Sequence, residues 1–267
     1  VARIVAAVAV LGIVGILVAG AVWWFFVRED AELATSPLPI ATQDGDATET
    51  PAGSDPTATS ADASDDTPTT EPSDDPSQVA GIEDGEVLTI VATNPAVQGA
   101  TEAAYFADEK LASLSLPSTA KGSTSDVTGQ VFLNAEGIHP DHESKIVVGV
   151  DSLQSDEGRR DQRVRGALEV TTFPAATFIA TSLAGYPAEF PENQEVTMQL
   201  TGLLTIHGVE REVTWDVIAT RAGDVLTALA TLETRYEDWD VPVLNIAGFV
   251  SVEEDVTLQL QIIAEVS

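Results

Sequence analysis

Apolar and polar residues alternate with a period of two along several segments from residue 81 onward. The clearest alternation covers residues 196–206, 213–217 and 256–262. This period places successive side chains on opposite faces of a strand, so that one face is apolar and the other polar. Turn-forming residues such as His207-Gly208 separate these segments. The same pattern predicts further strands near residues 127–135, 145–151, 177–182 and 225–232.

One polar segment, residues 155–166, interrupts the strand pattern. It predicts a loop that leads into a short helix, because Asp156 and Glu157 suit a helix N-terminus and Asp161 lies four residues before Arg165. Many strands with alternating faces and one short helix indicate an all-β domain, either an antiparallel barrel or a sandwich. Closure into a barrel leaves no exposed sheet edge.

The alternation also predicts which side chains face inward. Small residues at inward positions, such as Gly202, would leave room for a ligand. The inward side chains either fill the interior or line a pocket, since small eight-stranded barrels do both. The predicted inward set is Val131, Leu133, Phe178, Met198, Leu204, Trp215, Leu258 and Leu260.

An uninterrupted apolar run covers residues 4–27. As a helix it would be about 36 Å long, enough to cross a hydrocarbon core of about 30 Å. Aromatic residues gather at its end, at 23–26, as they do at membrane interfaces. A cleaved signal peptide is the alternative, since residues 19–21 resemble a cleavage site, but the run continues past them. We therefore predict a single transmembrane anchor at residues 1–28, with the C-terminal domain outside the cytoplasm.

Residues 29–80 have a different composition. They contain 13 acidic residues, no Lys or Arg, and seven of the 14 prolines, and no large apolar residue occurs between Ile40 and Val79. Such a segment cannot bury enough surface to offset its ordering entropy. It predicts a disordered linker between the anchor and a folded domain at residues 81–267, either a plain spacer or an O-glycosylated stalk.

The net charge and the motifs that the sequence lacks argue against several classes of function. The formal net charge of −31 argues against nucleic-acid binding, and the chain has no cysteine for disulfides or thiolate chemistry. His139 and His142 lie in a polar loop, which favours a solvated pair over a metal site. We find no nucleophile elbow, phosphate-binding glycine loop or zinc-protease motif. The sequence therefore predicts no enzyme, no metal and no cofactor.

Basic residues cluster in the polar segment: Arg159, Arg160, Arg163 and Arg165. They either pair with neighbouring carboxylates or form an anion clamp at a pocket mouth, because guanidinium groups match phosphate oxygens well. In the second interpretation, Arg159, Arg160 and Arg163 are candidate headgroup contacts.

Two ordered motifs resemble the YceI-like family. The first combines residues 152–156 and 159–161 with Leu168 to Phe178, including Phe173-Pro174, and the second is the hairpin at residues 200–213. Residues 109–111 and 124–129 are similar to the family's opening strands, so the likeness covers about residues 102–264. Glu210 departs from the usual Thr of the hairpin, and residues 235–241 match the closing turn only loosely.

The resemblance implies an extended eight-stranded, antiparallel, lipocalin-like barrel in an exported protein, with an apolar interior that holds an isoprenoid or similar amphiphile. It adds Phe173 to the candidate lipid contacts. Our leading hypothesis is a membrane-anchored protein that sequesters or carries such a lipid without catalysis. The alternative is a structural or interaction module at the cell surface with a packed barrel and no ligand.

Overall fold

The computed structural model describes residues 31–41, 85–111, 117–243 and 250–267. The predicted anchor at residues 1–28 lies outside these ranges, as does most of the predicted linker. Within the described ranges, no helix has the length and apolar character needed to cross a bilayer.

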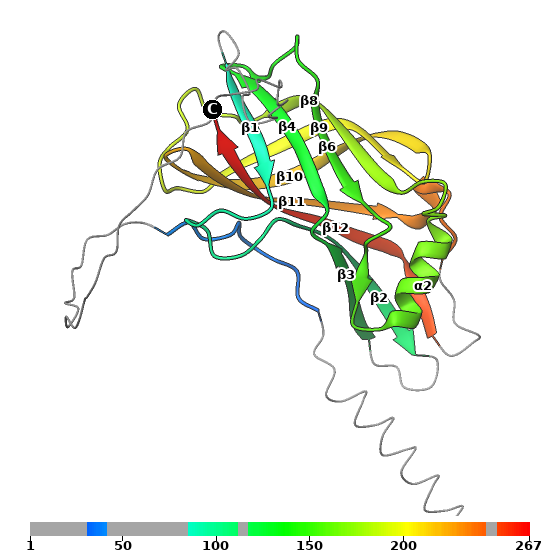
Figure 1. Cartoon of the computed structure of the whole chain (residues 1–267). Helices are drawn as coiled ribbons and strands as arrows, with labels where there is room; N and C mark the ends of the chain where they lie inside the picture. The colour runs from blue at the N-terminus through cyan, green and yellow to red at the C-terminus, as the bar shows by residue number, and fades with distance from the viewer. Residues whose placement is uncertain (1–30, 42–84, 112–116, 244–249) are drawn as a thin grey trace, which may run out of the picture.

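Eight of the described strands close into an antiparallel barrel (Figure 1). This result confirms the predicted barrel, rather than the sandwich, and the predicted strands lie within it. Neighbouring strands are hydrogen-bonded in the order β1 (Glu86–Val91), β4 (Val127–Asn134), β6 (Ser144–Gly149), β8 (Ala175–Ala184), β9 (Val196–Ile206), β10 (Val209–Ala222), β11 (Val225–Arg235) and β12 (Val250–Val266), which pairs with β1.

Strand β12 joins the barrel to a second group of strands. One of its edges pairs with β11, while the other pairs with β1 near the C-terminus and with β2 (Glu102–Leu111) nearer its start. Strand β2 continues to β3 (Pro117–Thr124) and then to β7 (Gln154–Ser155), and β5 (Gly137–Ile138) pairs with β4. The sheet therefore extends past the barrel at one end.

A short helix, α2 (Gly158–Ala167), lies at this end beside β2 and β3, as Figure 1 shows. Its N-cap is Glu157, whose side chain accepts a hydrogen bond from the Arg159 backbone N–H at 3.2 Å. The predicted helix in this segment is thus confirmed. We call this end of the barrel the α2 end; the far end carries the β10–β11 turn and the start of β1.

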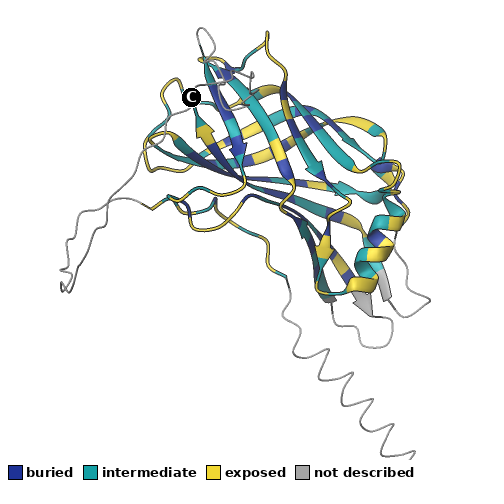
Figure 2. Cartoon of the chain, in the orientation of Figure 1, coloured by how far each residue is buried: buried dark blue, intermediate teal, exposed yellow. Residues whose placement is uncertain are grey.

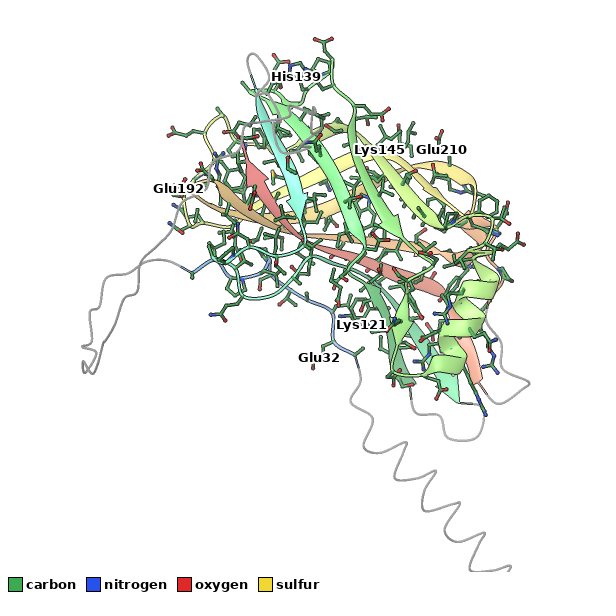
Figure 3. The ribbon with its side chains drawn as sticks, viewed as in Figure 1. Glu32, Lys121, His139, Lys145, Glu192 and Glu210 are labelled. Carbon is green, nitrogen blue, oxygen red and sulfur yellow. The ribbon has the colours of Figure 1, made fainter. Side chains whose placement is uncertain are left out.

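Buried and exposed residues alternate along the strands (Figure 2). The buried residues are mostly apolar, and most charged side chains lie on the outer surface. Lys145, Glu192 and Glu210 are examples on the outer surface (Figure 3). Gly202 does not leave the space that we predicted for a ligand, because a Cβ there would lie 2.7 Å from the Phe178 ring and 2.2 Å from the Ile179 carbonyl oxygen. The ring of Phe178 already occupies that space.

Residues 31–41 differ from our prediction of a disordered linker. They run along the outside of the barrel and form hydrogen bonds with it; the Ala34 N–H and carbonyl, for example, bond to the Gln259 side chain at 3.0 Å each. Pro37 is buried, and Ile40 forms an antiparallel bridge with Val97. We call residues 31–41 the strap. The remaining linker, residues 42–80, lies outside the described residues.

Candidate functional site

The barrel encloses an apolar cavity of about 170 Å³ at its α2 end, which we call the near cavity. Strands β2, β6 and β8 to β12 supply inward side chains, and α2 covers one side with Val164 and Ala167. The lining is almost entirely apolar because alternate residues of each strand face inward. An apolar cavity of this kind suits a hydrocarbon chain.

A second apolar cavity of about 90 Å³, the far cavity, lies nearer the other end of the barrel. Leu88 of β1, Leu133 of β4 and Met198 of β9 line it. Among the described residues, four line both cavities and therefore separate them: Ile146, Phe178, Trp215 and Leu260.

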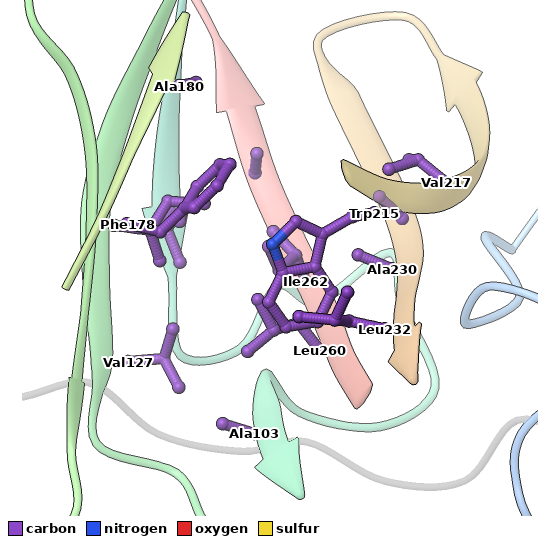
Figure 4. Close-up of a cluster of buried hydrophobic side chains, with 14 of the residues drawn as sticks. Ala103, Val127, Phe178, Ala180, Trp215, Val217, Ala230, Leu232, Leu260 and Ile262 are labelled. Atoms are coloured by element: carbon purple, nitrogen blue, oxygen red, sulfur yellow. The ribbon is translucent and has the colours of Figure 1, made fainter. Parts of the chain in front are cut away.

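The partition between the cavities is mainly aromatic. Phe178 and Trp215 point toward each other across the interior (Figure 4), with ring centroids 6.1 Å apart and ring planes at 78°. This edge-to-face arrangement is favourable for aromatic pairs. Trp215 Nε1 is buried and has no hydrogen-bond partner among the described residues, so it is a free donor between the two apolar spaces.

The predicted inward residues lie as follows. Leu204 and Leu258 line the near cavity, and Phe178, Trp215 and Leu260 lie at the partition. Three further residues of the predicted set line the far cavity but not the near one: Val131, Leu133 and Met198.

Phe173 lies outside both cavities. It belongs to the turn between α2 and β8, and its ring packs edge-to-face against His207 with centroids 5.1 Å apart. A Cβ on Gly208 would lie 2.7 Å from the same ring. Phe173 therefore holds the β9–β10 turn instead of facing the interior.

An ion pair between Arg160 and Glu109 lies at the rim of the near cavity. Arg160 of α2 lies 3.2 Å from Glu109 of β2 and 2.5 Å from Asp156. Its side chain and that of Glu109 are each only 11% exposed. Burial alone would lower the pKa of Arg160, but these two carboxylates outweigh it and hold the pKa above its usual value. Arg160 is thus largely neutralised by its own neighbours.

The other arginines of the cluster have different environments. Arg165 donates a hydrogen bond to the Leu153 carbonyl oxygen at 3.0 Å. Arg159 and Arg163 are exposed and form no ion pair with any described residue, and Arg163 also lines the near cavity. Of the three predicted headgroup contacts, Arg163 is therefore the one that is both unpaired and on the lining.

Two tyrosines add polar groups to this lining. Burial raises the pKa of Tyr105 above its ordinary value despite the nearby positive charge of Arg160. Burial, with a smaller contribution from Glu109, raises the pKa of Tyr236 to about 12. Both hydroxyls stay protonated near neutral pH and can donate hydrogen bonds to a ligand.

A polar cavity of about 290 Å³ adjoins the near cavity. Glu109, Ala120 and Arg160 line both, so the ion pair separates an apolar space from a polar one. Ala31, at the start of the strap, also lines the polar cavity. A ligand with an apolar tail and a polar head would match this arrangement.

The histidines do not form a metal site among the described residues. The rings of His139 and His142 lie 4.8 Å apart, and His142 stacks on Phe132 with centroids 5.0 Å apart. His207 Nδ1 lies 3.2 Å from the Trp239 carbonyl oxygen, which requires the tautomer with a proton on Nδ1.

Comparison with known proteins gives a family match. The family model of the YceI-like domain matches residues 97–264, more than half of the chain. Among solved structures, Burkholderia cenocepacia BcnA is 19% identical with a TM-score of 0.47, over 61% of this chain and 96% of that protein. A polyisoprenoid binding domain from Saccharophagus degradans is 14% identical with a TM-score of 0.48, over 68% and 98%. No curated protein matches the chain.

Proposed function

Because this chain belongs to the YceI-like domain family, we propose that it binds a long-chain amphiphile of the isoprenoid type inside its barrel, without catalysing a reaction. The observation that carries the proposal is the near cavity of about 170 Å³, lined almost entirely by apolar side chains. A barrel that acted only through its surface would gain stability by filling this space.

The energetics require a long tail. Burial contributes about 0.8 kcal/mol per CH₂, so ten buried carbons contribute about 8 kcal/mol. Association costs about 4–15 kcal/mol in lost translational and rotational freedom. A ten-carbon tail therefore binds weakly at best, and a stable complex needs a longer tail that fills the near cavity up to the partition at Phe178 and Trp215.

The polar head of the ligand would lie at the α2 end. Among the described residues of the lining, Arg163 is the cation without an ion-pair partner, and Tyr105 lines the same cavity. Arg160 is already engaged with Glu109 and Asp156, so it contributes mainly by closing the rim. This arrangement favours a head with few charges, such as an alcohol or a monophosphate.

We propose further that the chain is anchored in the cell membrane by residues 4–27, with the barrel outside the cytoplasm. The support is the uninterrupted apolar run and the aromatic residues at its end. A barrel with an apolar interior next to a bilayer would exchange lipid with it.

A matched pair of variants tests ligand binding. Ala176 of β8 lines the near cavity, whereas Ala184 of the same strand is exposed. Titration of the full-length chain with a 20-carbon prenyl alcohol should give one site, about tenfold weaker in Ala176→Phe because the new ring displaces at least two CH₂ groups. Ala184→Phe should bind like the wild type. Equal affinities for all three proteins, or no binding by any, would refute the proposal.

A further inference from the structure

The strap is bound to the barrel along its whole length, on the outer face of β11 and β12. Its hydrogen bonds reach three strands, β3, β11 and β12, and the loop between β1 and β2. They are Ala31 N–H to Thr119 O at 3.3 Å, the two Ala34–Gln259 bonds at 3.0 Å, Gln261 Nε2 to Ser36 O at 3.1 Å, Thr227 Oγ1 to Leu38 O at 2.8 Å, Gln98 N–H to Pro39 O at 3.2 Å and Ala41 N–H to Ala96 O at 2.7 Å.

The barrel surface is adapted to the strap. Ile263 and Leu229 belong to the outer face of the sheet, yet they are only 0% and 3% exposed. Gly99 has a φ of +130°, and a Cβ there would lie 2.8 Å from Leu38. This fit, together with the hydrogen bonds, indicates a specific interface of the folded protein.

The strap has a defined direction. It starts at Thr119 of β3, at the α2 end, and finishes beside Val97. Its first residue, Ala31, shares the polar cavity with Glu109 and Arg160, which also line the near cavity. The strap therefore first contacts the folded domain beside the rim of the near cavity.

Chain length then limits the distance to the proposed anchor. The apolar run ends at Val27, and four peptide steps to Ala31 span at most about 14 Å. If residues 29–80 were a free spacer, as we predicted, their mean span would be about 40 Å. Residues 42–84 instead connect the end of the strap to β1, so they do not lie between anchor and barrel.

We infer that the strap holds the barrel against the bilayer with its α2 end facing the lipid, so that the near cavity lies beside the membrane surface. The inference rests on the anchor proposed above. Two further features of this end suit a lipid surface. Leu33 of the strap is a large hydrophobic side chain that is 40% exposed. Arg159 and Arg163 are exposed cations in a strongly acidic chain and can meet lipid phosphates.

The orientation can be measured by energy transfer, because the chain has no native cysteine and accepts single labels. Gln162→Cys places a donor on α2, and Asp224→Cys places one at the β10–β11 turn; both positions are exposed. Strand β11 alone separates these ends by about 33 Å. The full-length chain would be reconstituted in phosphatidylcholine vesicles with some phosphatidylglycerol and a headgroup-labelled acceptor lipid. We expect severalfold more transfer from residue 162 than from residue 224.

Strap variants provide the control. Leu38→Asp puts a charge against Gly99 and should release the strap, so that transfer from the two sites becomes similar. Thr35→Asp adds the same charge at an exposed strap position and should keep the difference. Gly99→Leu, which fills the space of the Leu38 side chain, is a second way to release the strap if Leu38→Asp does not fold.

Vesicle flotation separates the possible failures. Equal transfer from both sites in a wild-type chain that floats with the vesicles would overturn the orientation and leave the anchor intact. A wild-type chain that does not float would overturn the anchor and the orientation with it. Greater transfer from residue 224 would show that the far end faces the membrane and would also refute the inference.

Discussion

Trp215 separates the near and far cavities, so its truncation should change the length of tail that the barrel accepts. In Trp215→Ala the two cavities, of about 170 and 90 Å³, would join into one. The matched control is Trp239→Ala, because Trp239 lines the near cavity alone. This control enlarges the near cavity without opening the partition.

The expected magnitudes follow from the packing. Removal of a buried Trp side chain costs about 3–5 kcal/mol of unfolding free energy. Trp215 Nε1 has no partner among the described residues, so removing this unsatisfied donor recovers about 1–3 kcal/mol. We therefore expect a net loss of about 2 kcal/mol. Each additional CH₂ that enters the joined cavity should strengthen binding by about 0.8 kcal/mol, or about fourfold in Kd.

The assay is a series of linear alcohols of increasing length, titrated into the full-length chain by calorimetry. In the wild type, the gain per CH₂ should fall at the length at which the tail meets Phe178 and Trp215. In Trp215→Ala the gain should continue to longer tails, whereas Trp239→Ala should keep the wild-type break. The same break in Trp215→Ala as in the wild type would refute the partition.

Two further predictions concern the rim of the near cavity. Arg160→Met should lower the unfolding free energy by about 3 kcal/mol at pH 7, because it leaves Glu109 buried without its partner. The control Arg159→Met should change it by less than about 0.5 kcal/mol. Equal effects of the two variants in urea denaturation would contradict the role of the ion pair. Since the folded-state pKa of Tyr236 is about 12 and its unfolded value is near 10, its contribution to stability is complete below about pH 10 and is lost as the pH rises toward 12. Tyr236→Phe should remove this part of the pH dependence of the unfolding free energy. If the variant loses as much stability as the wild type at alkaline pH, other groups cause that loss.

The period-two pattern identified eight residues that line the two cavities. Met198, Leu204, Trp215 and Leu260 lie on long strands, where alternation fixes the face of every side chain once one of them is known to face inward. Phe173 could not be placed in this way. It lies in a turn without periodicity, and its contact with His207 depends on the meeting of two segments that are distant in sequence.

The sequence of the strap contains apolar residues that the average composition of the linker hides. Leu33, Pro37, Leu38 and Ile40 are apolar residues at the start of an otherwise polar segment. A composition averaged over residues 29–80 hides them, and no local pattern indicates that they bind the outside of a barrel. The partition and the Glu109–Arg160 pair could not be predicted from the sequence either. In both, the contacting residues are separated by tens of residues and meet only when the barrel closes.

The central claim is that the barrel holds a lipid, and native mass spectrometry of the full-length chain, released gently from membranes, tests it most directly. We predict one additional mass per chain that extracts into organic solvent, present in Ala184→Phe and reduced in Ala176→Phe. A bare protein mass in all three, unchanged after incubation with polyprenyl alcohols and their phosphates, would contradict the claim and favour a barrel that acts through its surface.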